Sequence, residues 1–125
     1  MSKIGRAIKK CMHGISSDPQ GEIKASFNFP PDFIGFKGHF PGKPVLPGVC
    51  KIQAILCMLE SVTQKRPRLK EVVSAKFFAS VTYNEDIAFS VFQSLEGNEE
   101  VVINASVTNG DKKIAKIQLR AVFEI

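Results

Sequence analysis

The residues best suited to chemistry lie around His39 and around a predicted helix start about ten residues further along the chain. The imidazole of His39 titrates near neutral pH, so it can take or give a proton under ordinary conditions. The backbone N–H groups near Gly48 and Val49 follow a proline at the predicted helix start, where unpaired donors and the positive end of the helix dipole stabilise a negative oxygen. Gln53 lies one turn further on, and its amide can hydrogen-bond a hydroxyl or a water but cannot release a proton. These residue types favour a site that polarises a carbonyl group and moves a proton.

A long restrained loop and a buried helix must position these residues. The segment 30–48 contains five of the seven prolines and four of the nine glycines. A loop this long and this stiff is usually functional. Helical spacing of apolar residues then predicts a helix from Pro47 to about Gln64. A second stripe on this helix is made of small residues, which would allow close approach: Cys50, Ala54, Cys57 and Ser61. A helix that is apolar on most sides is expected to be buried.

The rest of the chain is expected to form strands. Alternating or Val- and Phe-rich stretches predict strands over 22–29, 71–83, 87–95, 100–107 and 113–125. Residues 5–13 are interpreted as a further strand, joined to 22–29 by a turn at 16–21, and the basic run 65–70 as a solvated turn. The order predicts one α+β domain over 1–125, in which an antiparallel sheet can wrap around one central helix.

Composition narrows the classes of function. The net charge is +5, but no block of five basic residues exists, so nucleic acid is not the expected partner. A mild positive charge also suits an acidic protein or a phosphate-bearing ligand. The three cysteines have no CxxC spacing, which predicts free thiols in a reducing cytoplasm. We expect no signal peptide, no membrane span, no metal site and no cofactor.

The segment 36–49 resembles the signature of the beta-hydroxyacyl-[acyl-carrier-protein] dehydratases. It contains Gly-His-Phe-Pro, then a Pro-x-x-Pro-Gly-Val helix start, and Lys76-Phe77 followed by Val81 also resembles the family. The resemblance implies a hotdog fold, a 3-hydroxyacyl thioester of an acyl-carrier protein or of coenzyme A as substrate, and no cofactor. It also implies a homodimer in which His39 of one chain faces Gln53 of the other.

The sequence departs from this pattern at the acidic residue of the helix, which is replaced by Gln53. The loop that usually carries Pro-Gly-Asp reads 83-Tyr-Asn-Glu-Asp-86, so only the aspartate remains. Dehydration needs a base, for which His39 is the candidate, donors for the enolate-like oxygen, and an acid for the departing hydroxyl. Loss of a positioned acid costs about 10²–10⁴-fold in rate. Two rescues are conceivable: His39 acting as both base and acid, or Glu60, about 10 Å further along the helix.

Several alternatives stay open. A thioesterase, with Gln53 orienting a water, and a non-catalytic acyl-thioester binder are competing functions on the same fold. Gln53 can also be a buried structural amide. The aromatic side chains of Phe33, Phe36 and Phe40 either line an acyl tunnel or pack in the core.

The remaining candidate residues have structural interpretations. Cys50 and Cys57 are interpreted as packing residues rather than nucleophiles, because the sequence shows no basic partner for either thiol. His13 is interpreted as structural.

Overall fold

The computed structural model describes residues 2–37, 44–96 and 99–124. Within these residues, two α-helices, a short 3-10 helix and six strands follow one another along the chain. Their order is α1 Lys3–Lys10, β1 Met12–Ser17, β2 Ile23–Asn28, η1 Ile34–Phe36, α2 Gly48–Thr63, β3 Arg66–Phe77, β4 Asp86–Glu96, β5 Glu100–Asn109 and β6 Lys112–Glu124.

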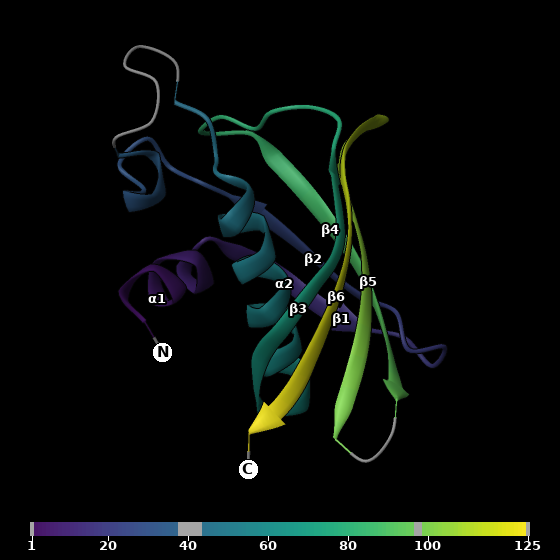
Figure 1. The fold of residues 1–125 in the computed structure, drawn as a ribbon. Helices are drawn as coiled ribbons and strands as arrows, with labels where there is room; N and C mark the ends of the chain where they lie inside the picture. Colours follow the sequence, from purple (N-terminus) through teal and green to yellow (C-terminus); the bar gives the residue numbers. More distant parts are fainter. Residues whose placement is uncertain (1, 38–43, 97–98, 125) are drawn as a thin grey trace.

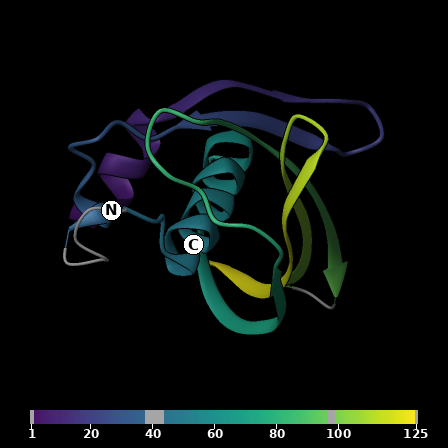
Figure 2. The ribbon, with the colours of Figure 1, turned by 90° about the horizontal axis from the view of Figure 1, so that it is seen from above.

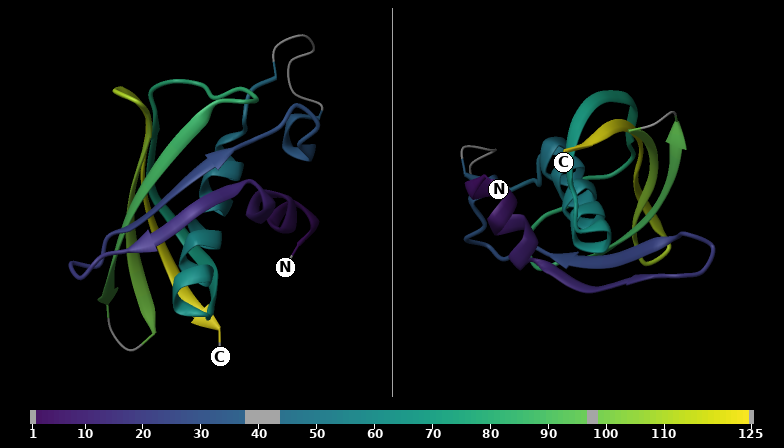
Figure 3. Two further views of the ribbon diagram at one scale, coloured as in Figure 1. Left: turned by 180° about the vertical axis from the view of Figure 1, so that it is seen from behind. Right: turned by 90° about the horizontal axis from the view of Figure 1, so that it is seen from below.

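The six strands form one antiparallel sheet in the order β1-β2-β4-β5-β6-β3. The sheet curls around α2, which lies along its concave face (Figure 1), and the view from above shows strands on several sides of the helix (Figure 2). The views from behind and from below show α1 beside α2 (Figure 3). The predicted α+β architecture, an antiparallel sheet wrapped around one central helix, is confirmed.

Alternation along the strands builds the core between sheet and helix. In β5, Val101, Ile103, Ala105 and Val107 are buried, whereas the intervening Asn104 is exposed. The side chains of α2 that meet this face are fully enclosed: Ala54, Ile55, Met58 and Leu59 are each 0% exposed. Period-two burial on the sheet and near-complete burial of the helix produce one continuous apolar core.

The central helix begins and ends close to the predicted residues. Pro47 is the N-cap, with extended backbone geometry, and its ring pre-sets the chain for the first turn. Gln64 is the C-cap in the left-handed region, with φ 60°, and its N–H donates to the carbonyl of Glu60 at 2.9 Å. No helix among the described residues is both long and apolar enough to cross a membrane.

The prediction of a strand over 5–13 is wrong, because α1 occupies Lys3–Lys10 and β1 begins only at Met12. Ser2 caps this helix, and its hydroxyl accepts a hydrogen bond from the N–H of Gly5 at 3.1 Å. Ile4 and Ile8 lie one turn apart and face the core. This spacing is helical, and a search for the alternating pattern of a strand does not detect it.

The prediction that the basic run 65–70 is a solvated turn is also wrong, because β3 begins at Arg66. Pro67 is buried and lies opposite Phe123 of β6. Although β3 precedes β4 in the sequence, the two strands are not neighbours in the sheet. β3 pairs instead with β6, at the edge opposite β1. Proline is tolerated there because β3 is an edge strand, where a missing N–H leaves no neighbour unsatisfied.

A chain of aromatic contacts links β2 to the segment that leads toward His39. The ring centroid of Phe27 lies 5.0 Å from that of Phe89 and 6.0 Å from that of Phe29, and Phe29 lies 4.8 Å from Phe33. Aromatic pairs at these separations contribute beyond their buried area. The core is therefore continuous with the loop predicted to be functional.

We expect Phe27→Ala to lower the free energy of unfolding by about 3–5 kcal/mol, because it leaves a cavity among Phe29 and Phe89. Phe92→Ala is the matched control, since Phe92 is 46% exposed on β4 and its truncation should cost less than about 1 kcal/mol. Urea denaturation followed by circular dichroism measures both. Equal losses for the two variants would contradict the assigned core.

Candidate active site

The start of α2 has the open geometry expected of an oxyanion site. Gly48 is the first helical residue, no side chain of the described residues caps the helix, and its first turn contains no acidic residue. The N–H of Leu46 donates to the carbonyl of Val81 at 2.7 Å, which anchors the segment before the helix. Because the first N–H groups of a helix have no helical acceptor, those of Gly48 and Val49 are suited to a carbonyl oxygen.

Gly48 is required by the close approach of an aromatic ring. A Cβ atom at this position would lie 2.9 Å from Cζ of Phe77, at the end of β3. The ring therefore packs directly on the helix start. Any larger residue at 48 would have to displace Phe77 or the first turn of α2.

Gln53 lies on α2 and is half-buried. It lines a pocket of about 320 Å³ between α2, α1 and the start of β3, together with Glu60 and Arg66. Its amide makes no hydrogen bond to the part of the chain that the structure describes. Whether Gln53 faces a ligand or is a structural amide stays a prediction.

Glu60, the conceivable substitute acid, lies in the same pocket but is engaged elsewhere. Its Oε2 is 3.8 Å from Nε of Arg66. The Glu60 carboxylate therefore already has a cationic partner. The Glu60 rescue is therefore weakened.

His39 and Phe40 lie outside the described residues, but the segment before them is tightly held. Phe33 and Phe36 are buried, with ring centroids 5.6 Å apart. A Cβ at Gly35 would clash with Cε2 of Phe33 and would lie 3.0 Å from Sγ of Cys50, so η1 packs closely on α2. Both phenylalanines take part in core packing, and whether they also line an acyl tunnel stays a prediction.

The cysteines have the environment of packing residues. Cys11, Cys50 and Cys57 are buried free thiols. Burial raises the pKa of the Cys50 thiol, and it raises that of Cys57 to about 11, with a further contribution from Glu60. Thiols held so far from ionisation are poor nucleophiles, which agrees with the interpretation from the sequence.

Lys51 is a notable residue that the sequence analysis missed. Its side chain is only 3% exposed, and it is the one buried charged side chain among the described residues. Nζ donates to the carbonyl of Leu46 at 3.4 Å and lies 5.1 Å from the ring centroid of Phe77. Burial lowers the pKa of this ammonium group. The sequence did contain an indication of this residue, because the lysine interrupts the apolar face of a helix that is expected to be buried.

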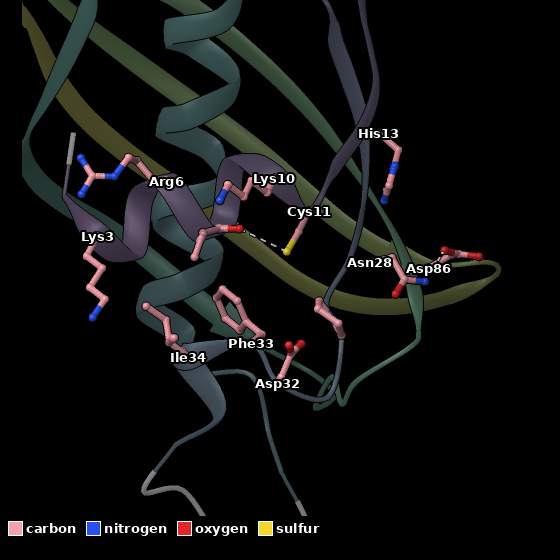
Figure 4. Close-up of a pocket in the computed structure, with 12 residues that line it drawn as sticks. Lys3, Arg6, Lys10, Cys11, His13, Asn28, Asp32, Phe33, Ile34 and Asp86 are labelled. Carbon is pink, nitrogen blue, oxygen red and sulfur yellow. Dashed lines mark hydrogen bonds between the residues drawn. The ribbon is translucent and has the colours of Figure 1, made fainter.

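A second pocket, of about 840 Å³, lies beside α1 and is called the α1 pocket here. Lys3, Arg6 and Lys10 line it from α1, and Figure 4 shows them near Phe33 and Ile34 of the segment that leads to His39. The remaining lining includes His13, Asp32 and Asp86. Interpreting 5–13 as a strand left Lys3 outside the element, whereas the helix Lys3–Lys10 brings it onto one face with Arg6 and Lys10. The sequence analysis therefore missed this surface.

No group of three or more His, Cys, Asp or Glu side chains suited to a metal ion occurs among residues 2–37, 44–96 and 99–124.

Comparison with known proteins identifies the family. The sequence model of a family described as ApeI-like, ApeI dehydratase, matches residues 15–117. The chain belongs to the ApeI-like dehydratase family. A 3-hydroxyacyl-[acyl-carrier-protein] dehydratase FabZ from Wolbachia sp. subsp. Drosophila simulans (strain wRi) is 32% identical over 119 residues, covering 88% of this chain and 82% of that protein. A FabZ from Clostridium acetobutylicum is 29% identical over 87 residues, covering 63% and 62%.

Solved structures agree on the fold. The dehydratase heterocomplex ApeI:P from Xenorhabdus doucetiae superposes with a TM-score of 0.73 at 16% identity, covering 89% of this chain and 96% of that chain. A hypothetical thioesterase with coenzyme A from Streptococcus pneumoniae TIGR4 gives 0.69 at 8% identity, covering 97% and 94%. The predicted hotdog fold and the predicted dehydratase family are confirmed.

Proposed function

We propose that this ApeI-like dehydratase eliminates water from a 3-hydroxyacyl thioester carried on an acyl-carrier protein. The observation that carries the proposal is the uncapped start of α2, with Gly48 pressed against Phe77 and Gln53 one turn further on. A thioester carbonyl placed against the N–H groups of Gly48 and Val49 is polarised, which makes the adjacent C–H more acidic.

In the proposed reaction, His39 takes a proton from the carbon next to the carbonyl. The negative charge moves to the carbonyl oxygen, where the helix start stabilises it. The 3-hydroxyl then leaves as water after receiving a proton. Gln53 hydrogen-bonds that hydroxyl but supplies no proton, so the proton comes back from the imidazolium of His39. Phe33, Phe36 and Phe40 are proposed to border the acyl chain.

Replacing Gln53 with Glu should raise the rate of 2-enoyl formation about tenfold or more, because a carboxylic acid can protonate the leaving hydroxyl. His39→Ala should lower the rate by at least about 10²-fold, because the base is removed. A panel of 3-hydroxyacyl-carrier proteins, followed by mass spectrometry, measures both.

Gln93→Glu is the control for added charge, since Gln93 is exposed on β4. If neither the parent nor Gln53→Glu forms a 2-enoyl product, the dehydratase proposal fails. Release of free carrier thiol in the same assay would instead indicate a thioesterase.

A homodimer is proposed to complete this site, with His39 of one chain facing Gln53 of its partner. β3 is an edge strand of 12 residues that pairs only with β6 among the described strands. It exposes apolar side chains along its length, with Val72 42%, Val73 41% and Phe77 48% exposed, and Val49 of α2 is 62% exposed. A long apolar edge strand is normally covered in a native protein. Pairing of two β3 edges would cover it and bring two helix starts together.

We expect Val73→Lys to convert a dimer into a monomer of 13.8 kDa, because a lysine on an edge strand opposes strand pairing. Dehydration should be lost with the dimer. Leu95→Lys is the matched control, since Leu95 is 74% exposed on β4, away from β3. Size-exclusion chromatography with light scattering measures the mass.

A monomeric parent protein would refute the shared site. A parent that becomes active only with a second hotdog chain would replace the homodimer with a heterocomplex.

The α1 pocket is proposed to receive the carrier protein. Lys3, Arg6 and Lys10 lie on one face of α1 above the apolar side chains of Phe33 and Ile34. A basic rim steers an acidic partner toward a site and accelerates association at low ionic strength. The buried free thiols suit a reducing cytoplasm, where the proposed reaction would take place.

The double variant Lys3→Glu, Lys10→Glu should raise KM for the carrier-bound substrate about tenfold at low salt and less at high salt, because the steering charge is reversed. The control Lys112→Glu, Lys113→Glu changes the net charge equally, on the exposed β5–β6 hairpin. Coenzyme A thioesters serve as the second substrate. Equal effects of the α1 variant on both substrates would indicate phosphate binding instead of carrier recognition.

A further inference from the structure

Three features of its surroundings make a positive charge on the Lys51 side chain energetically unfavourable. Its side chain is 97% buried, which removes the ammonium from water. It is the fourth residue of α2, near the positive end of the helix dipole. Within the described residues it forms no ion pair with a carboxylate, and the sequence of 38–43 contains no acidic residue.

The described contacts satisfy the ammonium only in part. Nζ has three donors, and one of them reaches the carbonyl oxygen of Leu46 at 3.4 Å. The ring of Phe77, with its centroid 5.1 Å away, offers only the weak attraction of a π face. A buried cation with so little compensation is suited to stabilise a negative charge that forms close by during a reaction.

The same contacts place Lys51 at the proposed oxyanion site. Leu46 lies immediately before the N-cap residue, and the Phe77 ring that faces Nζ also packs on Gly48. The carbonyl oxygen of Leu46 carries a partial negative charge, so it would repel a negatively charged oxygen at the helix start. The ammonium of Lys51 holds this carbonyl and offsets its charge.

We propose that Lys51 is a positioning residue for dehydration, whose positive charge, acting through the Leu46 carbonyl and the start of α2, stabilises the negative oxygen that forms on the thioester. This inference rests on the proposed function. Lys51 does not touch the substrate. Its charge favours the enolate-like state over the starting thioester, which raises kcat more than it lowers KM.

The groups around Lys51 define its pH dependence. Leu46 and Phe77, which face it from the preceding segment and from β3, do not ionise, and among described residues the Cys50 thiol is the titratable group that acts on it. Burial lowers the Lys51 pKa and is opposed by Cys50. The charge is therefore present below this lowered pKa and is lost as the pH rises through it, and the rate should fall with it.

The test compares Lys51→Met, Lys51→Gln and the control Lys116→Met, which removes an exposed lysine from β6. Lys51→Met keeps the length and apolar stem of the side chain, so it should fold and melt at a higher temperature, because no charge is buried. Its kcat should fall about 10–100-fold with little change in KM, and the decline at high pH should disappear.

Lys51→Gln retains a donor for Leu46 but no charge, and should be as slow as Lys51→Met. Unchanged kcat and pH profile in Lys51→Met would overturn the proposal, as would full activity in Lys51→Gln, which would assign Lys51 only the hydrogen bond.

A second readout separates this proposal from the proposed function. The infrared carbonyl stretch of an isotope-labelled crotonyl thioester on a carrier protein reports polarisation without turnover. The bound frequency should be lowered in the parent and should return toward its free value in Lys51→Met, but not in Lys116→Met. If the parent polarises the carbonyl through Lys51 yet eliminates no water, the dehydratase proposal alone fails. If the parent dehydrates and Lys51→Met shifts neither rate nor frequency, the Lys51 proposal alone fails.

Discussion

The enclosure of α2 by the curled sheet is the constraint on which the rest of the structure depends. Because Ala54, Ile55, Met58 and Leu59 are completely buried, the face of the helix that meets the sheet has no access to solvent. The helix start, between the anchored Leu46 and the end of β3, is where its backbone donors can meet a ligand. The fold therefore places polar chemistry at the rim of the core and leaves the core itself apolar.

Two aromatic packing contacts connect the enclosed helix to the segments around its start. The ring of Phe77 packs on Gly48, and the ring of Phe33 packs beside Gly35, whose own neighbour on α2 is Cys50. Gly48 allows a ring from β3, and Gly35 allows the thiol of Cys50 on α2, to approach the backbone more closely than a Cβ atom would permit. The positions of β3 and of η1 relative to the helix start are thus fixed by packing, before any ligand binds.

The sequence predicted the features that depend on local residue pattern. It missed the features that depend on which strands pair or on how deeply a side chain is buried. Pro47 and the apolar spacing after it were sufficient for α2, and alternation was sufficient for β5 and β6. The place of β3 beside β6 follows from contacts between distant segments, which no local pattern encodes. α1 was missed because its single face, with Ile4 and Ile8, is short. The burial of Lys51 depends on how deeply one side of α2 is covered, and helical periodicity alone does not reveal this.

The two edges of the sheet differ in a way that limits how copies of the chain can join. β1 has six residues, its pairing with β2 is irregular between His13 and Ser16, and Gly14 has φ 60°. Its exposed residues are mostly polar. A short, bulged, polar edge resists further strand addition, whereas the long apolar β3 edge invites it. A sheet that can grow from one side only reaches closure after a single twofold pairing, so the architecture disfavours open-ended fibres.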